Sequence, residues 1–428
     1  MNGSAISMEP TTHPASSRAP KLPRVAAVQD GARLHYGMPV ALHRAGMLER
    51  MFTDGFIESH SANSFLFSWL KAVGISRRVN DRRCPELDGT TILQNRWLTI
   101  RERTHRFRCK SIEAHWEWLA TLTERWILSQ GFGEANALMG FIRNVSPGLC
   151  AAARRQGLVV VADQMIAPAA IECWEMDQQQ KRWPGWEPLN PVDKLKRLKR
   201  YEELTWSELH HVTCASEYVR HGLIQEGVSP ERISVIPYPI DENSFAFVDR
   251  QGRTVPVVVG FIGAVNLRKG APYFFEVAKR FDPKMARFVM VGPVHLEKWA
   301  VAKFSGSVEV VGGVPRAEVA EWMRRFDIVL FPSTCEGSAG ALMEAMASGL
   351  PIVTSPNSGT VARHGRECLV AAYDDVDALA RYVQELVENP NRRLEMGRAA
   401  WKRSQEFNLN SYSRDLSALF HRLVKGKT

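Results

Sequence analysis

The chain has 428 residues, of which 45% are hydrophobic and 24% charged, so a globular protein with two domains is expected. No run of about 18 apolar residues occurs, and no membrane-spanning helix is therefore predicted. Seven scattered cysteines without a CxxC pair argue against a disulfide framework or a zinc ribbon, and they favour a reducing compartment, most simply the cytoplasm.

The net charge of +9, with a pI of about 9.2, leaves three classes of partner open: nucleic acid, an anionic membrane surface or an anionic small substrate. Basic residues are dense at 101–110 and 193–203. For either stretch alone, a solvated helix face is the simpler explanation. Because no nucleic-acid-binding module is recognisable, nucleic acid is not the expected partner.

Residues 1–23 are rich in Ser, Pro and Thr and lack an apolar core, which predicts a disordered tail and not a signal peptide. Residues 24–29 then predict a buried strand, 30–37 a glycine-containing loop and 38–46 a short helix. This strand–loop–helix order is typical of the opening of a dinucleotide-type fold.

The rest of the first half is less regular. Within 61–130 the clearest element is a long helix at 109–130, and a helical insertion precedes Leu209. Further strands are predicted at 135–142, 157–163, 211–216 and 233–239.

The second half alternates cleanly between apolar runs and amphipathic helices. Near-continuous Val, Ile and Leu runs predict parallel strands that are buried on both faces. The join between the halves is expected at 237–245, where proline and polar residues interrupt the pattern. The predicted strands are 255–263, 286–292, 308–313, 327–333, 350–356 and 367–372.

We therefore predict an α/β protein with two Rossmann-like, doubly wound parallel-sheet domains that face each other across a cleft. The predicted N-terminal domain spans 24–240 and the C-terminal domain 241–406. Residues 407–428 predict a final helix that could pack back on the N-terminal domain.

Ligands of such sheets bind beyond the carboxyl ends of the strands, so the residues after each strand are the candidates. Arg268 and Lys269 stand beside Gly270, after one strand and directly before a helix. A helix N-terminus with two adjacent cations is a phosphate site on physical grounds, although a solvated polar loop would look the same.

The stretch "CEGSAGALMEAMASG" places Glu336 on a small-residue loop and Glu344 inside an otherwise apolar helix. Small residues let backbone amides approach a ligand, and Glu336 can accept hydrogen bonds from hydroxyl groups. Glu344 needs donors of its own. These could be ligand hydroxyls, amides of a neighbouring loop, or an arginine in an ion pair.

Two other polar loops follow strands, at 357–360 and at 30–36, and the second of these holds Gly31 and Arg33. No P-loop, GxGxxG, GxSxG or HExxH motif occurs at the expected place. The one DxD, at 375–377, precedes a helix, and it is interpreted as a helix start and not as a metal site.

These residues resemble the donor site of glycosyltransferase family 4, of GT-B fold, whose signature is a Glu-x7-Glu motif matched here by "EGSAGALMEAMASGLPIV". The stretch "GFIGAVNLRKG" is similar to the family's phosphate-contact segment. The stretch "HVTCASEYVRHGLIQEGVSPERISVIPYPIDENSF" looks like its interdomain junction. The resemblance covers about 211–406 well and the N-terminal half loosely.

The resemblance implies a retaining glycosyltransferase that moves a sugar from a nucleotide-diphosphate sugar to a hydroxyl of a glycan or a lipid-linked acceptor, in exopolysaccharide or cell-surface glycan synthesis. It implies that the N-terminal domain holds the acceptor and the C-terminal domain the sugar donor, with no metal and no other cofactor. Glu336 would hold sugar hydroxyls as the catalytic carboxylate, and Glu344 would bind the ribose. The other implied donor-site residues are Arg268 and Lys269 at the diphosphate, Gly263, the amides of Ser338, Ala339, Gly340 and Ala341, and Gly31 with Arg33 from the N-terminal domain.

The sequence departs from the family pattern at three places. Ala264 stands where an arginine is common, Ala339 where a glycine is usual, and Phe141 and Arg143 occupy the neighbourhood of an expected histidine. A non-catalytic nucleotide-sugar-binding partner therefore stays an alternative, as does another GT-B enzyme such as a phosphorylase or an epimerase. The Trp- and Arg-rich stretch 97–126 could face an anionic membrane, or it could be a core helix with a solvated basic face.

Overall fold

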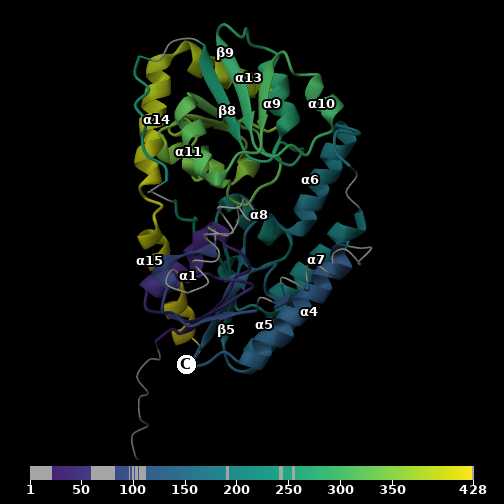
Figure 1. Cartoon of the computed structure of the whole chain (residues 1–428), viewed down its shortest axis with the longest axis vertical. Helices are drawn as coiled ribbons and strands as arrows, with labels where there is room; N and C mark the ends of the chain where they lie inside the picture. Colours follow the sequence, from purple (N-terminus) through teal and green to yellow (C-terminus); the bar gives the residue numbers. More distant parts are fainter. Residues whose placement is uncertain are drawn as a thin grey trace, which may run out of the picture.

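The computed structural model describes residues 22–58, 82–95, 97–98, 101, 105, 112–188, 192–240, 244–252 and 256–426. Two α/β domains, each built on one sheet, lie one above the other (Figure 1). The predicted tail as far as residue 21, and most of the basic stretch 101–110, lie outside the described residues.

Within the described residues, the N-terminal sheet has seven parallel strands in the order β3-β2-β1-β4-β5-β6-β7. Strands β2 and β3 were not predicted from the sequence. The strands are β1 (Val25–Val28), β2 (Leu48–Thr53), β3 (Ile92–Gln94), β4 (Ala137–Phe141), β5 (Val159–Gln164), β6 (His211–Cys214) and β7 (Ile233–Val235).

The C-terminal sheet, counted over the same described part of the chain, has six parallel strands in the order β10-β9-β8-β11-β12-β13. All six were predicted. They are β8 (Val257–Ile262), β9 (Ala286–Val291), β10 (Val308–Gly312), β11 (Ile328–Phe331), β12 (Ile352–Thr354) and β13 (Cys368–Val370).

Helices cover both faces of each sheet, as the alternation of β1 illustrates. Val25 and Ala27 pack into one hydrophobic cluster, while Ala26 and Val28 pack into another on the opposite face. The prediction of two doubly wound parallel sheets is confirmed. The helices are α1 (Gly37–Arg44), α4 (Ile112–Gln130), α5 (Pro147–Arg155), α6 (Ala169–Arg182), α7 (Val192–Glu208), α8 (Glu217–Gln225), α9 (Ala271–Ala278), α10 (Lys298–Ala302), α11 (Arg316–Arg325), α12 (Gly340–Ala347), α13 (Val376–Glu388), α14 (Pro390–Ser404) and α15 (Leu409–Lys425).

The DxD stretch is a helix start, as predicted. Asp375 is the N-cap of α13, and its carboxylate accepts a hydrogen bond of 2.9 Å from the amide of Ala378. This bond satisfies one of the amides that a helix cannot pair by itself.

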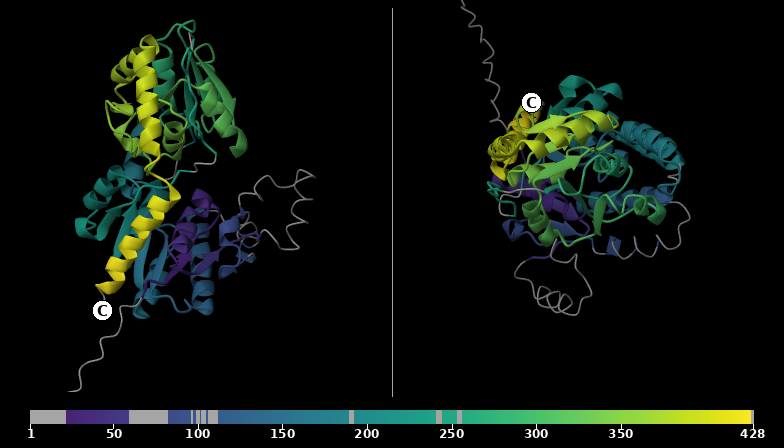
Figure 2. Two further views of the ribbon diagram at one scale, coloured as in Figure 1. Left: turned by 90° about the vertical axis from the view of Figure 1, so that its left-hand side faces the viewer. Right: turned by 90° about the horizontal axis from the view of Figure 1, so that it is seen from above.

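The chain returns to its first domain at the end. α15 runs along the N-terminal domain beside α1 (Figure 2). Tyr412, Leu416 and Phe420 belong to the same buried cluster as β1, and the Ser413 hydroxyl donates to the carbonyl of Ala41 at 2.7 Å. Among the helices described, none is both long and apolar enough to cross a bilayer.

Candidate functional site

The two sheets direct their carboxyl edges toward each other, and loops that follow strands of both domains are in direct contact. The amide of Ala167, after β5, donates to the carbonyl of Glu336, after β11, over 3.3 Å. The Ser216 hydroxyl, after β6, donates to the carbonyl of Gly337. Ligands of parallel sheets bind at these edges, so this junction is the candidate site.

A buried carboxylate with two cations lies at the centre of the junction. Glu336 is 8% exposed, and its Oε1 lies 2.7 Å from Lys269 Nζ and 3.0 Å from Arg268 Nη1. Burial alone would raise the pKa of Glu336, but Lys269 and Arg268 hold that pKa below its ordinary value. The sequence predicts that these three residues lie at the carboxyl edge of one sheet, and in the structure they also form ion pairs with one another.

Two glycines make room for this cluster. Lys269 packs over Gly263, where an added Cβ would lie 3.1 Å from Lys269 Cδ, and its ammonium lies 5.0 Å from the centroid of the Phe331 ring. Gly270 precedes α9 with a φ of 74°, and a Cβ there would lie 1.8 Å from the carbonyl oxygen of Pro332. The close approach of the loops therefore requires glycine at position 270, and the φ of 148° at Gly263 is one that residues with a side chain rarely adopt.

The loop amides that the sequence assigned to a ligand are only partly available. The amide of Ala339 donates to the carbonyl of Ser358 at 3.1 Å, which contradicts the prediction that it is offered to a ligand. Gly340 and Ala341 are the first residues of α12, and a helix cannot pair its first amides by itself. Together with Ser338, these two remain candidates for contact with a ligand.

Glu344 lies on α12 and makes an ion pair. Its Oε1 is 2.5 Å from Arg316 Nη2 on α11, and its side chain is 13% exposed. The guanidinium of Arg316 also lies 5.3 Å from the centroid of the Phe245 ring. The sequence left three kinds of donor open for Glu344, and the structure supplies one of them, an arginine.

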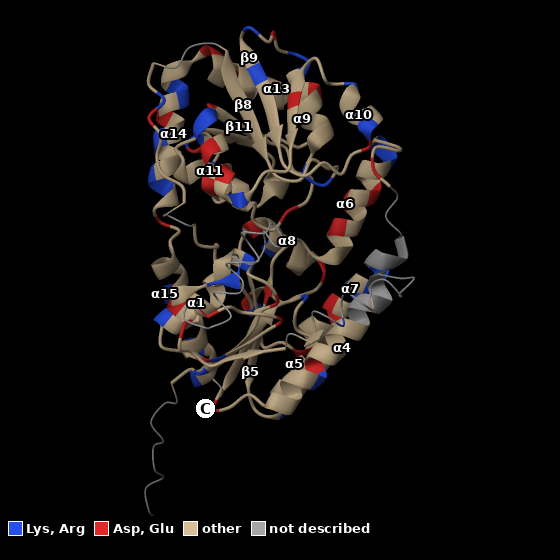
Figure 3. Cartoon of the chain, in the orientation of Figure 1, with Lys and Arg blue, Asp and Glu red and all other residues tan. Residues whose placement is uncertain are grey.

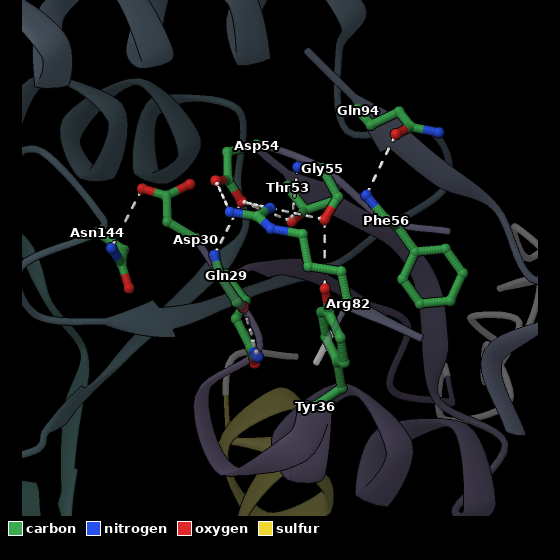
Figure 4. A network of polar contacts seen from close by, with 11 residues as sticks. Gln29, Asp30, Tyr36, Thr53, Asp54, Gly55, Phe56, Arg82, Gln94 and Asn144 are labelled. Carbon is green, nitrogen blue, oxygen red and sulfur yellow. Dashed lines mark hydrogen bonds and ion pairs between the residues drawn. The ribbon is translucent and has the colours of Figure 1, made fainter. Parts of the chain in front are cut away.

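On the N-terminal side, a carboxylate fixes the loop after β1. Asp54 Oδ1 accepts a hydrogen bond of 2.8 Å from the amide of Gly31. The same carboxylate makes a bidentate pair with Arg82, with distances of 2.8 and 2.7 Å (Figure 4). Gly31 has a φ of 68°, which glycine adopts without steric cost.

The next turn of this loop is strained. Leu34, His35 and Tyr36 have φ values of 51°, 49° and 62°, a left-handed run that costs about 1 kcal/mol or more per residue. Tyr36 is fully buried and packs edge-on against Phe56, and its hydroxyl donates to the carbonyl of Gly55 at 3.2 Å. The residue types gave no sign of this run, because they disfavour it.

Arg33 reaches the junction through Met165. Its Nη1 lies 3.1 Å from Met165 Sδ, and its side chain is exposed. The carbonyl of Met165 is so close to Gly337 that a Cβ on that glycine would lie 1.7 Å from the carbonyl oxygen. Arg33 thus contacts the side chain of the residue whose backbone lies against the loop that carries Glu336.

Arg143, which occupies the neighbourhood of the histidine that the resemblance would supply, is committed to a buried network. It contacts Glu172 at 2.9 Å and Glu202 at 3.1 Å, and the side chain of Glu202 is fully buried. Phe141 is buried as the last residue of β4. Phe141 has no polar side-chain group, and Nε and Nη2 of Arg143 are both engaged by carboxylates of the N-terminal domain.

Sequence reasoning missed three polar groups at this edge. Asp54 went unnoticed because the strand before it was not predicted, and Arg82 pairs with it only in the fold. Asn357 lies in the polar loop 357–360, but the sequence does not indicate its role. Its backbone carbonyl accepts a hydrogen bond of 3.0 Å from the amide of Glu336. In the described part of the chain, no group of three or more His, Cys, Asp and Glu side chains could hold a metal ion.

Residues 256–389 match the family model described as "Glycosyl transferases group 1". The amylovoran biosynthesis glycosyltransferase AmsK of Erwinia amylovora is 29% identical over 221 residues, which cover 48% of this chain and 54% of that protein. The MMP alpha-(1->4)-mannosyltransferase of Mycolicibacterium hassiacum is 24% identical over 276 residues, which cover 62% of this chain and 64% of the relative. The chain thus spans between about half and two thirds of the length of these relatives.

Two solved structures resemble the whole chain. Sucrose-phosphate synthase from Thermosynechococcus elongatus has a TM-score of 0.63 at 14% identity, covering 94% of this chain and 99% of the other. Anabaena HepE, in complex with UDP and glucose, has a TM-score of 0.58 at 14% identity, covering 92% and 98%. The fold is GT-B. In the GT-B arrangement, the cluster of Glu336 with Arg268 and Lys269 lies in the C-terminal domain, inside the matched segment 256–389.

Proposed function

We propose that this protein is a retaining glycosyltransferase of family 4, which moves a sugar from a nucleotide-diphosphate sugar to a hydroxyl acceptor. The observation that carries the proposal is the buried Glu336 between Arg268 and Lys269, at the edge where the two domains meet. The named activities of the relatives and the GT-B fold support it.

In the proposed complex, Arg268 and Lys269 neutralise the diphosphate, and Arg33 approaches it from the N-terminal domain. When the cations turn to the phosphates, Glu336 loses its ion pairs with them and accepts hydrogen bonds from the sugar hydroxyls. Glu344, oriented by Arg316, binds the ribose. Because fixed cations face the charge that develops on the leaving group, the site needs no metal ion.

For the chemical step we propose attack on the same face of the sugar that the diphosphate leaves. The leaving phosphate oxygen takes the proton of the acceptor hydroxyl, so no protein base is required. This agrees with Arg143 being committed to Glu172 and Glu202. The contribution of the protein is then to orient the two substrates and to stabilise charge.

The nucleotide can be identified by thermal unfolding with UDP, GDP, ADP and UDP-glucose, UDP being the first choice because HepE binds it. A ligand at 100 times its Kd should stabilise the protein by about 2.7 kcal/mol. We expect Glu344→Ala to lose this response and Glu321→Ala, an exposed glutamate on α11, to keep it. A wild-type protein that responds to no nucleotide would contradict the proposal.

A non-catalytic nucleotide-sugar-binding protein is the second candidate, because Arg143 is locked and Phe141 is buried where the resemblance supplies a histidine. Hydrolysis or transfer of the sugar from the nucleotide that binds would exclude this candidate. Binding without any turnover, with sugar, glycan and lipid-linked acceptors all present, would favour it.

We further propose a glycan or lipid-linked acceptor at an anionic, cytoplasmic membrane surface, in exopolysaccharide synthesis as for the AmsK relative. Lys and Arg are dispersed over both domains (Figure 3). The cations that we propose for this contact are the exposed Lys196, Arg197 and Arg200 of α7, beside the half-exposed Leu204.

The membrane proposal predicts co-sedimentation with phosphatidylglycerol vesicles and not with phosphatidylcholine vesicles. The binding should weaken as salt rises from 0.05 to about 0.5 M, since screening shortens the reach of surface charges. The triple change Lys196→Glu, Arg197→Glu and Arg200→Glu should abolish it. Equal binding to both kinds of vesicle would contradict the electrostatic contact.

A further inference from the structure

Helix α6 belongs to the first half of the chain, but it bridges the two domains (Figure 1). Its first turn is held by the N-terminal domain: Glu202 Oε2 accepts a hydrogen bond of 2.7 Å from the amide of Ala169, and Glu172 pairs with Arg143 at 2.9 Å. The helix then leaves that domain and runs along the C-terminal one. We call residues 169–188 the brace.

The remaining turns of the brace are fixed to the C-terminal domain by polar contacts and aromatic packing. Gln179 Oε1 accepts a hydrogen bond of 2.6 Å from the Tyr273 hydroxyl on α9, and Arg182 lies 3.0 Å from Asp374. Trp186, 5% exposed, is part of the core of the C-terminal domain. The brace therefore packs as a component of the domain that follows it in sequence.

One carboxylate of the brace holds a loop of the candidate site. Glu175 is 5% exposed. Its Oε1 accepts a hydrogen bond of 3.0 Å from Asn357 Nδ2, and its Oε2 accepts one of 2.9 Å from the Tyr373 hydroxyl. Asn357 also donates to the carbonyl of Thr334 at 2.8 Å. Its own carbonyl receives the amide of Glu336 at 3.0 Å, so a short chain of hydrogen bonds links Glu175 to Glu336.

A second carboxylate of the brace holds the other loop. Glu187 Oε1 accepts a hydrogen bond of 2.6 Å from the amide of Leu267, the residue before Arg268 and Lys269. Burial raises the pKa of both Glu175 and Glu187, because a buried carboxylate loses the hydration that stabilises its charge. Keeping two carboxyl groups at buried positions therefore costs the protein stability. Each of them meets a loop that carries one side of the Glu336 cluster.

We propose that Glu175 and Glu187 are positioning residues, which set the two loops of the sugar-donor site from the brace, a segment of the preceding half of the chain. Glu175 orders the segment that carries Glu336, and Glu187 orders the segment that carries the two cations. The part concerning the ligand rests on the proposed function; the ordering of the loops does not.

The test is amide hydrogen exchange of the free protein, read over peptides 334–340 and 263–270. Glu175→Met keeps the length and helix propensity of the side chain but removes both acceptors, and we expect about tenfold faster exchange over 334–340. Glu187→Met should have the same effect over 263–270 and leave 334–340 unchanged. Each variant is thus the control for the other loop.

Two further variants separate positioning from simple packing. Glu175→Gln can still accept from Asn357 and donate to the oxygen of Tyr373, so its exchange should stay close to that of the wild type. Asp177→Asn changes an exposed carboxylate on the same helix and should change neither loop. If Glu175→Met fails to fold, Glu187→Met, which changes a less buried residue, still tests the proposal.

The binding of UDP provides a second readout. If the wild type binds UDP, Glu175→Met and Glu187→Met should each raise the Kd for UDP about tenfold, since a loosened loop must be ordered on binding. If the wild type does not bind UDP, the proposed function is in question, but the exchange experiment still decides about the brace. Folded methionine variants with wild-type exchange in both loops would overturn the proposal.

Discussion

Glu336→Gln should lower the stability of the free protein and increase the stabilisation that UDP provides. The change leaves Arg268 and Lys269, whose side chains are 24% and 16% exposed, without their carboxylate. Removing one partner of a largely buried ion pair typically costs about 3 kcal/mol. A bound diphosphate would restore the missing negative charge, so nucleotide binding should become tighter while sugar transfer falls by about 100-fold or more.

The measurement is the free energy of unfolding, with and without UDP, at neutral pH. The cations hold the pKa of Glu336 below its ordinary value, so the wild-type group is ionised there and its contribution is lost only as the pH falls through that low pKa. Transfer is assayed in parallel.

Glu367→Gln is a matched control. Glu367 is also buried in the C-terminal domain, with a side chain 1% exposed and a distance of 2.5 Å to Arg363. Its loss should destabilise the protein without changing the effect of UDP. UDP could instead raise the free energy of unfolding of both variants equally, or leave that of Glu336→Gln unchanged. Either result would show that Arg268 and Lys269 are not the diphosphate site.

The strands that the sequence revealed are apolar runs, and most of them are largely buried, although β10 alternates between buried and less buried residues. Runs such as 257–262 are apolar because both faces of a parallel strand are covered. β2 escaped notice because its first half, with Glu49 and Arg50, is only partly buried and contributes to surface ion pairs. β3 has three residues, too few to show a period.

The site could be predicted as a set of residues but not as a set of contacts. Positions after buried strands were enough to bring Arg268, Lys269 and Glu336 to one edge. That these groups bind one another depends on side-chain distances which no spacing encodes. The brace was invisible for a related reason: its contact face includes Glu175 and Gln179, so no apolar stripe indicated that α6 packs on the second domain.

Gly337→Ala should separate the two domains at a point where their backbones are in contact. An added Cβ would lie 1.7 Å from the carbonyl oxygen of Met165 and 2.8 Å from Ile166 Cα. Both atoms are backbone, so no side chain can rotate away, and the loop after β5 must move by an ångström or more. A displacement of about 1 Å at a reacting centre can reduce the rate about 100-fold, and we expect a loss of transfer of at least that size.

The displacement can be measured without a substrate. Exchange at the amide of Ala167, which donates to Glu336, should become faster, and the radius of gyration from small-angle scattering should rise. Gly340→Ala is the control, because an added Cβ there meets no atom within 4 Å and the residue starts α12. That variant should keep the exchange and the radius of the wild type. If Gly337→Ala kept both as well, the contact between Met165 and Gly337 would not hold the domains together, and Arg33 would have no fixed place at the sugar-donor loop.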